Sequence, residues 1–176
     1  MLFKPHFLFW IFVLLWSAIG QAQITSNTSA QKSISRLDTL EIRAKIIRVI
    51  DGDTAEMMYH DLFLKVRLDH IDAPEIRGGQ AYGRAAGQYL RRRIEGEEVL
   101  LKGQRKLDGF GRFLATVYTL EGLNINKEMV KNGYAWHFSQ YSKDTTYRDL
   151  EAQAKQHKRG LWKEKSPVAP WTFRKR

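Results

Sequence analysis

The chain contains no cysteine among its 176 residues. This absence excludes disulfide bonds, thiolate catalysis, cysteine-based metal sites and a lipid-modified N-terminal cysteine. Long apolar segments are scarce. The run at 7–19 is shorter than the roughly 20 residues that a membrane-spanning helix needs. Because the chain has no disulfide bonds, the stability of the folded protein must come from an ordinary hydrophobic core, which a chain of this length can build.

Acidic residues are outnumbered, with 19 Asp and Glu against 29 Lys and Arg. The formal net charge of +10 favours polyanionic partners, either nucleic acid or an anionic membrane surface. A hydrophobic content of 43% and a charged content of 27% are typical of a soluble globular protein.

The N-terminal residues 1–22 have the features of an export signal. Lys4 precedes the apolar run, and Gly20 and Ala22 are small residues at the positions that a signal peptidase reads. We expect cleavage after Ala22, and an uncleaved membrane anchor is the alternative.

The rest of the chain divides into three parts by composition. Residues 23–39 are rich in Ser, Thr, Gln and Asn, which predicts a disordered linker. Residues 40–165 carry the periodic apolar pattern of a single folded domain. Residues 166–176 form a basic tail that contains proline and tryptophan.

The apolar pattern of the central part predicts five strands and three helices. The strands are expected at 40–50, 54–59, 62–68, 99–102 and 113–118. The helices are expected at 82–94, between 124 and 133, and between 144 and 160. This order is compatible with an α+β fold, mainly β, in which a five-stranded OB barrel is decorated by helices. The pattern alone does not choose that barrel over another α+β arrangement.

Three carboxylates and two arginines stand out along this domain: Asp53, Arg67, Asp72, Glu75 and Arg112. Hydrolysis of a phosphodiester needs cations directed at the phosphoryl oxygens and a group that orients water. Carboxylate oxygens bind a hard divalent ion, and the arginine fork matches two phosphate oxygens. Taken singly, each residue would more often be a turn acid, a solvated loop acid or a surface arginine.

The order and spacing of these motifs resemble the thermonuclease family, also called micrococcal nuclease-like or SNase-like. The resemblance covers roughly residues 40–163. It rests on the segments Asp51-Gly52-Asp53-Thr54, Val66-Arg67-Leu68, Ile71-Asp72-Ala73-Pro74-Glu75, Asp108-Gly109-Phe110-Gly111-Arg112 and Gly160-Leu161-Trp162. The resemblance implies the OB barrel with three helices.

The resemblance also implies a role for each site residue. A Ca2+ ion would be held by the carboxylates of Asp53 and Asp72 and the backbone carbonyl of Ala73. Glu75 would orient the attacking water, and Arg67 and Arg112 would bind the scissile phosphate. Phe110 departs from the family, in which a tyrosine is common at this position.

Four residues are candidates for contact with the nucleic acid: Lys102, Lys106, Phe110 and Tyr141. The lysines could attract the phosphate backbone, and the aromatic rings could stack on bases. A solvated basic face and core packing are the alternative interpretations.

We therefore expect an exported, Ca2+-dependent endonuclease that acts as a monomer on DNA and RNA. It would prefer single-stranded or frayed substrate, because a shallow OB face reads accessible backbone, and by resemblance it would leave 3′-phosphate ends. A non-catalytic basic OB module that binds nucleic acid is one alternative. A structural protein anchored to a membrane by residues 7–19 is the other.

Overall fold

The structure is a computed structural model that describes residues 39–175, without the side chain of Lys106. The predicted export signal at 1–22 and nearly all of the predicted linker at 23–39 lie outside the described residues, as does the predicted contact of the Lys106 side chain. Within the described range, no helix has the length and apolar character needed to cross a membrane.

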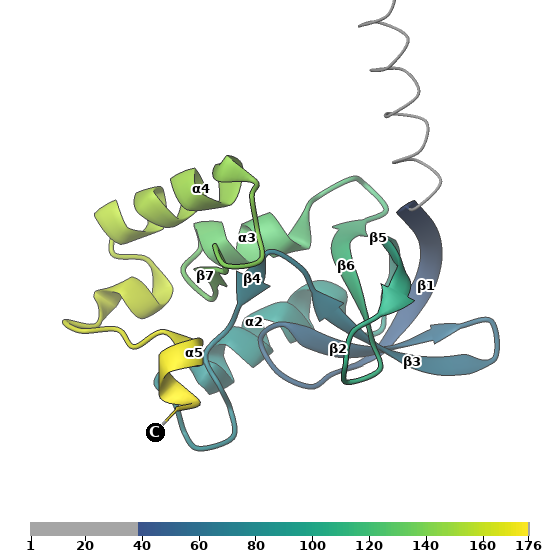
Figure 1. Cartoon of the computed structure of the whole chain (residues 1–176), viewed down its shortest axis with the longest axis horizontal. Helices are drawn as coiled ribbons and strands as arrows, with labels where there is room; N and C mark the ends of the chain where they lie inside the picture. The colour runs from purple at the N-terminus through teal and green to yellow at the C-terminus, as the bar shows by residue number, and fades with distance from the viewer. Residues whose placement is uncertain (1–38, 176) are drawn as a thin grey trace, which may run out of the picture. The chain divides into compact units, whose positions relative to one another are not determined.

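Five strands close into a barrel in the order β1-β2-β3-β6-β5 (Figure 1). They are β1 (Thr39–Val49), β2 (Thr54–Tyr59), β3 (Leu62–Leu68), β5 (Glu98–Leu107) and β6 (Arg112–Thr119). Strand β3 runs parallel to β6, whereas the β1-β2, β2-β3 and β5-β6 pairs are antiparallel. The predicted five-stranded, mainly β barrel is confirmed.

The alternation of side chains in β1 shows why the sequence forms this barrel. Ile42, Ala44 and Ile46 are buried, whereas the residues between them are exposed. Strand β5 is longer than the predicted 99–102 and continues through Gly103, where a side chain would not fit. A Cβ at Gly103 would lie 2.2 Å from the carbonyl oxygen of Leu114, and the register shifts beyond this point.

The three predicted helices are present as α2 (Gly83–Ile94), α3 (Ile125–Lys131) and α4 (Thr145–Gln156). Helix α4 ends before Gly160, and a 3-10 turn, η1 (Gly160–Lys163), follows it. A four-residue helix in the tail, α5 (Pro170–Phe173), was not predicted. It begins with proline at its first position, which suits a helix start.

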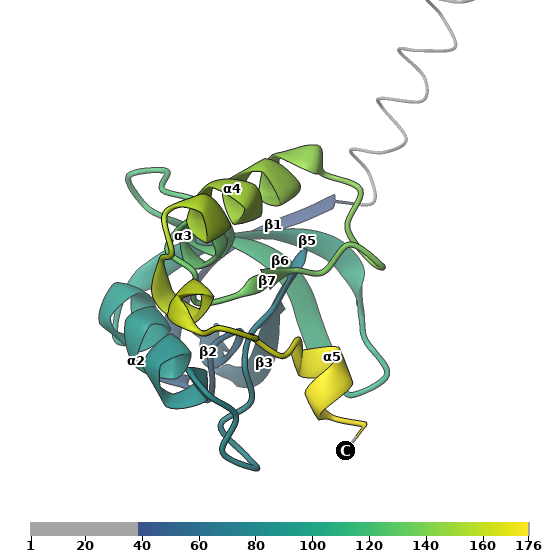
Figure 2. The same cartoon turned by 90° about the vertical axis from the view of Figure 1, so that its left-hand side faces the viewer.

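The helices cover the barrel and share its core. Helix α3 contacts β6, α2 and α4 (Figure 2). Its buried residues Ile125 and Met129 join Leu90 and Ile94 of α2 in the same apolar cluster as the barrel interior. A two-stranded sheet of β4 (Ile71–Asp72) and β7 (Trp136–His137) lies beside the barrel.

The turn between β1 and β2 packs closely against two other elements. A Cβ added at Gly52 would lie 2.6 Å from the Cβ of Ala73 and 2.7 Å from the Cβ of Ala86. Only glycine fits there, so the turn packs against the residue after β4 and the first turn of α2. This contact brings residues 51–54 and 71–75 together, although they are separate in the sequence.

Candidate active site

Arg67 connects two of the predicted acids. It lies near the end of β3, opposite Thr54 of β2, so its side chain faces the turn that carries Asp53. Nη1 is 2.8 Å from Oδ2 of Asp53, and Nη2 is 2.8 Å from Oδ1 of Asp72. The Arg67 side chain is only 11% exposed, so these pairs are screened weakly by solvent.

Asp53 is buried and held from several sides. Its Oδ2 accepts a hydrogen bond from the backbone N–H of Ala73 at 2.6 Å, and its Oδ1 accepts one from the Thr54 hydroxyl. Burial, partly offset by the charge of Arg67, raises the pKa of Asp53 to about 8. Ionising this carboxylate is therefore costly unless further positive charge lies beside it.

Asp72 is the last residue of β4, and Glu75 lies on the loop that follows this strand. The Asp72 side chain is 1% exposed, whereas that of Glu75 is 27% exposed and open to a water molecule. The loop returns tightly to α2, because a Cβ at Gly83 would lie 2.2 Å from the carbonyl oxygen of Glu75. The backbone N–H of Glu75 donates to Oε1 of Gln80 at 2.9 Å, which fixes the start of the loop.

A third arginine reaches these acids from the C-terminal tail. Nη2 of Arg174 is 2.7 Å from Oδ2 of Asp72, and its Nη1 is 2.7 Å from Oε1 of Glu75. The hydrogen bond with Asp72 raises the pKa of Arg174 above its ordinary value. The sequence shows that the tail is basic, but it does not show where the tail lies in the fold.

Arg112 lies on the strand next to Arg67 and is held by its own loop. It begins β6 and pairs with Asp108, with Nη2 to Oδ2 at 2.7 Å. Burial opposes ionisation of Asp108, but hydrogen bonds from Arg112 and backbone amides outweigh it and lower the pKa of that carboxyl. The guanidinium also lies 5.1 Å from the centre of the Phe110 ring.

The predicted substrate contacts separate into two kinds. Phe110 and Tyr141 are 84% and 79% exposed, so their rings are accessible to a base. Lys102 pairs with Glu41 of β1 at 3.0 Å and lies 5.5 Å from the ring centre of Tyr118. The positive charge of Lys102 is therefore partly neutralised by Glu41, another residue of the barrel.

The donor set fits a hard divalent ion. Asp53 and Asp72 both bind the Arg67 guanidinium, so their carboxylates already converge on one positive charge. Among residues 39–175 there is no cluster of three or more Asp, Glu, His or Cys side chains that could hold a metal. Asp53 and Asp72 are therefore the side chains of this site that could hold a hard cation, and waters would supply further ligands.

Comparison with known proteins shows the family of this chain. The family described as staphylococcal nuclease homologue matches residues 65–164. An uncharacterized endonuclease of Escherichia coli O157:H7 is 39% identical over 136 residues, which cover 77% of this chain and 87% of the relative. A micrococcal nuclease of Shigella flexneri is 33% identical over 145 residues, covering 77% and 82%. An uncharacterized endonuclease of Haemophilus influenzae is 36% identical over 164 residues, covering 93% and 85%. These relatives support a nuclease function.

Proposed function

Because the chain belongs to the family of staphylococcal nuclease homologues, we propose that it is an exported, Ca2+-dependent nuclease. It hydrolyses phosphodiester bonds of DNA and RNA, prefers single strands and leaves 3′-phosphate ends. The observation that carries the proposal is the bridge that Arg67 forms between Asp53 and Asp72, with Glu75 beside it. Acids and arginines are rarely buried in proteins, and those that are buried are usually paired. Two buried acids around one weakly exposed arginine are therefore an unusual arrangement.

Asp53, Asp72 and the backbone carbonyl of Ala73 would hold the ion. When bound, it supplies a fixed positive charge that polarises a phosphoryl oxygen. The raised pKa of Asp53 is consistent with this role, because Arg67 compensates only part of the cost of burying this carboxylate, and a bound cation would lower that cost further.

The reaction then depends on residues of this chain. Glu75, partly exposed, orients a water molecule and accepts its proton as the water attacks phosphorus. Arg67 and Arg112 neutralise the charge that grows on the phosphoryl oxygens. The bond from phosphorus to the 5′-oxygen breaks, and the 5′-oxygen takes up a proton from solvent and leaves as a hydroxyl. The phosphate stays on the 3′ end of the other product.

The exposed rings of Phe110 and Tyr141 support a preference for single strands, because unpaired bases are free to stack on them. A duplex holds its bases stacked within the helix, where these rings do not reach.

The test is cleavage of single-stranded DNA by the purified protein, with Ca2+ and with chelator. Arg67→Ala and Glu75→Gln should each reduce the rate by about 10²-fold or more. Glu97→Gln is the control, because Glu97 is an exposed glutamate in the turn before β5. Folded protein that binds DNA in a salt-sensitive manner but never cleaves it would favour the binding module. Products with a 3′-hydroxyl and a 5′-phosphate would contradict the proposed bond polarity.

Export is tested by sequencing the N-terminus of the protein from its native host. A start at Gln23 supports cleavage of the signal, whereas an intact Met1 in the membrane fraction supports the anchor. We also expect a monomer, which light scattering on the purified protein tests.

A further inference from the structure

We propose that Arg174 is a further active-site residue, which positions Asp72 and Glu75 in the cation-free protein and releases Asp72 when a divalent cation binds. The inference rests on the proposed function, because it concerns the same two acids. It assigns the C-terminal tail to the active site.

The contacts of Arg174 are directed at the acids that the reaction needs. Its Nη2 bonds to Oδ2 of Asp72 at 2.7 Å, and its Nη1 lies 3.2 Å from Oδ1. The same Nη1 donates to Oε1 of Glu75 at 2.7 Å. With Arg67 on Oδ1 at 2.8 Å, both oxygens of Asp72 are occupied by guanidinium groups.

The tail is fastened to the rest of the site by contacts of its own. Gln80 accepts a hydrogen bond from the backbone of Glu75 and donates one to the carbonyl of Val168 at 2.8 Å. The ring of Trp171 stacks on that of Phe138 with centroids 5.4 Å apart. These contacts place Arg174 beside the acids.

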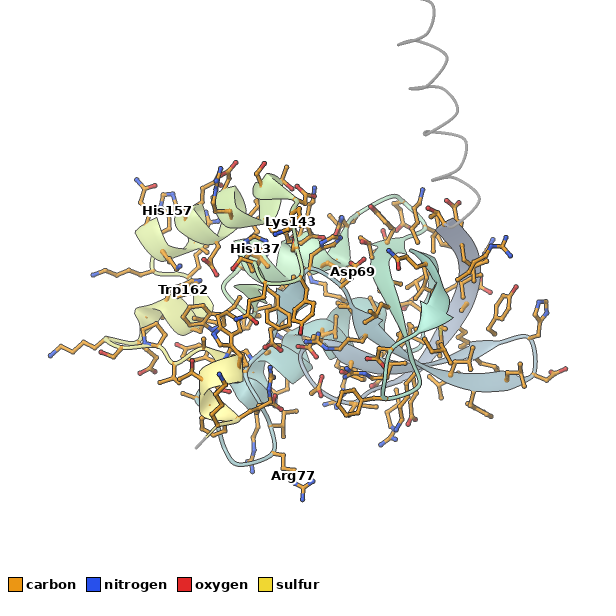
Figure 3. All side chains as sticks on the ribbon, viewed as in Figure 1. Asp69, Arg77, His137, Lys143, His157 and Trp162 are labelled. Atoms are coloured by element: carbon orange, nitrogen blue, oxygen red, sulfur yellow. The ribbon has the colours of Figure 1, made fainter. Side chains whose placement is uncertain are left out.

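Another arginine close by shows that proximity in the sequence does not explain the pairing. Arg77 lies only two residues after Glu75, yet it is exposed and points away from the domain (Figure 3). Arg174 is separated from Asp72 by 102 residues and still binds it. The fold therefore selects the arginine of the tail.

The consequence for cation binding follows from electrostatics. A divalent ion that takes an oxygen of Asp72 would lie within a few ångströms of the Arg174 guanidinium, and like charges at such distances repel strongly outside bulk water. Arg174 is 43% exposed, whereas Arg67 is 11% exposed, so Arg174 is the arginine that can move into solvent. After releasing Asp72, Arg174 can remain paired with Glu75 or turn toward an incoming phosphate group.

The experiment measures Ca2+ affinity by calorimetry on the full chain after removal of metal with chelator. Four proteins are compared: wild type, Arg174→Gln, Arg174→Lys and the matched control Arg77→Gln. Loss of the competing guanidinium should tighten Ca2+ binding of Arg174→Gln by roughly fivefold, a change expected from one charge-assisted pair. Arg174→Lys keeps the positive charge but loses the planar guanidinium group. Its Ca2+ affinity should therefore lie between those of wild type and Arg174→Gln. Arg77→Gln removes the same charge and should match wild type.

Thermal unfolding of the same proteins gives a second readout. Arg174→Gln should melt lower than wild type in chelator, because buried Asp72 has lost a partner, and should gain more from added Ca2+. Equal or weaker Ca2+ binding by Arg174→Gln, with wild type binding and cleaving normally, would overturn this inference alone. A wild-type protein that binds no divalent ion would overturn the cation requirement and this inference together.

Discussion

Asp53 accepts a hydrogen bond of 2.6 Å from the backbone amide of Ala73, and this bond joins the turn after β1 to the loop that follows β4. One carboxylate thus fixes the relative position of the two segments that carry the proposed cation ligands. The same Oδ2 receives Nη1 of Arg67 at 2.8 Å. Asp53 is therefore a structural link as well as a proposed ligand, and a substitution can separate the two roles.

Asp53→Asn retains an oxygen that can accept the amide of Ala73 but loses the negative charge. We expect Ca2+ affinity to fall by roughly 10- to 100-fold or more, because even indirect supports of a metal site have effects of that size. The cation-free protein should remain folded, since burial already disfavours the ionised form of Asp53. Calorimetry and thermal unfolding measure the two effects, with exposed Asp61→Asn as the control. Unfolding of Asp53→Asn in chelator would contradict this separation of roles.

Gly83→Ala tests how the loop holds Glu75. The added Cβ would meet the carbonyl oxygen of Glu75 at 2.2 Å and the backbone nitrogen of Ile76 at 3.0 Å, so the loop must shift. We expect a loss of about 1–3 kcal/mol in the free energy of unfolding, and a lower kcat because Glu75 moves with the loop. Gly109→Ala is the control, because a Cβ there meets nothing within 4 Å. Denaturant titration and steady-state kinetics check both effects, and an unchanged kcat would show that the loop yields without moving Glu75.

The strands and helices could be predicted from the sequence because alternation and helical periodicity are local features, whereas the choice of the OB barrel and of the site residues came from the family resemblance. Alternation in β1 and β3 and the spacing from Arg67 to Glu75 are short-range patterns that survive in the fold. Asn124 caps α3 within the predicted range, because its side-chain oxygen accepts a hydrogen bond from the backbone N–H of Lys127.

What the sequence missed depends on contacts between distant segments. Asn126 is buried and bonds to the backbone N–H of Val117 on β6, which no local pattern reveals. Arg174 reaches Asp72 across 102 residues, and its signal in the sequence was only a basic tail. A periodic pattern reports the face of an element, but it does not report which distant segment covers that face.

A buried polar network beside the barrel should make stability depend on pH. Oδ1 of Asp69 accepts hydrogen bonds from the Thr116 hydroxyl at 2.7 Å and the Asn126 amide at 2.8 Å. Nε2 of His70 lies 3.4 Å from Oδ2 of Asp69. Asp69, labelled in Figure 3, is the residue that follows the end of β3. Burial raises the pKa of Asp69, although these hydrogen bonds and His70 oppose the shift, and the nearby phenol of Tyr147 adds no charge below alkaline pH.

The sign of this effect follows from proton binding. An acid whose pKa is raised by folding keeps its proton in the folded protein at a pH where the unfolded chain has lost it. Stability therefore falls as pH rises from about 4 through the raised pKa of Asp69. Asp69→Asn cannot titrate, so its unfolding free energy should fall less over that range. Denaturant titrations from acidic to neutral pH measure the difference, and parallel pH profiles for the two proteins would contradict the assignment.

Phe110 tests whether an aromatic ring beside Arg112 binds substrate. The ring is 84% exposed and lies 5.1 Å from the Arg112 guanidinium, so its removal should leave the stability of the domain unchanged. If a base stacks on it, Phe110→Ala should raise KM for short single-stranded DNA by roughly fivefold or more, since such stacking contributes about 1–3 kcal/mol. Phe110→Tyr keeps the ring, adds the hydroxyl common in the family, and should have a lower KM than Phe110→Ala. A fall in kcat with constant KM would instead mean that the ring acts by holding Arg112, because a group that only binds the ground state does not change the chemical step in that way.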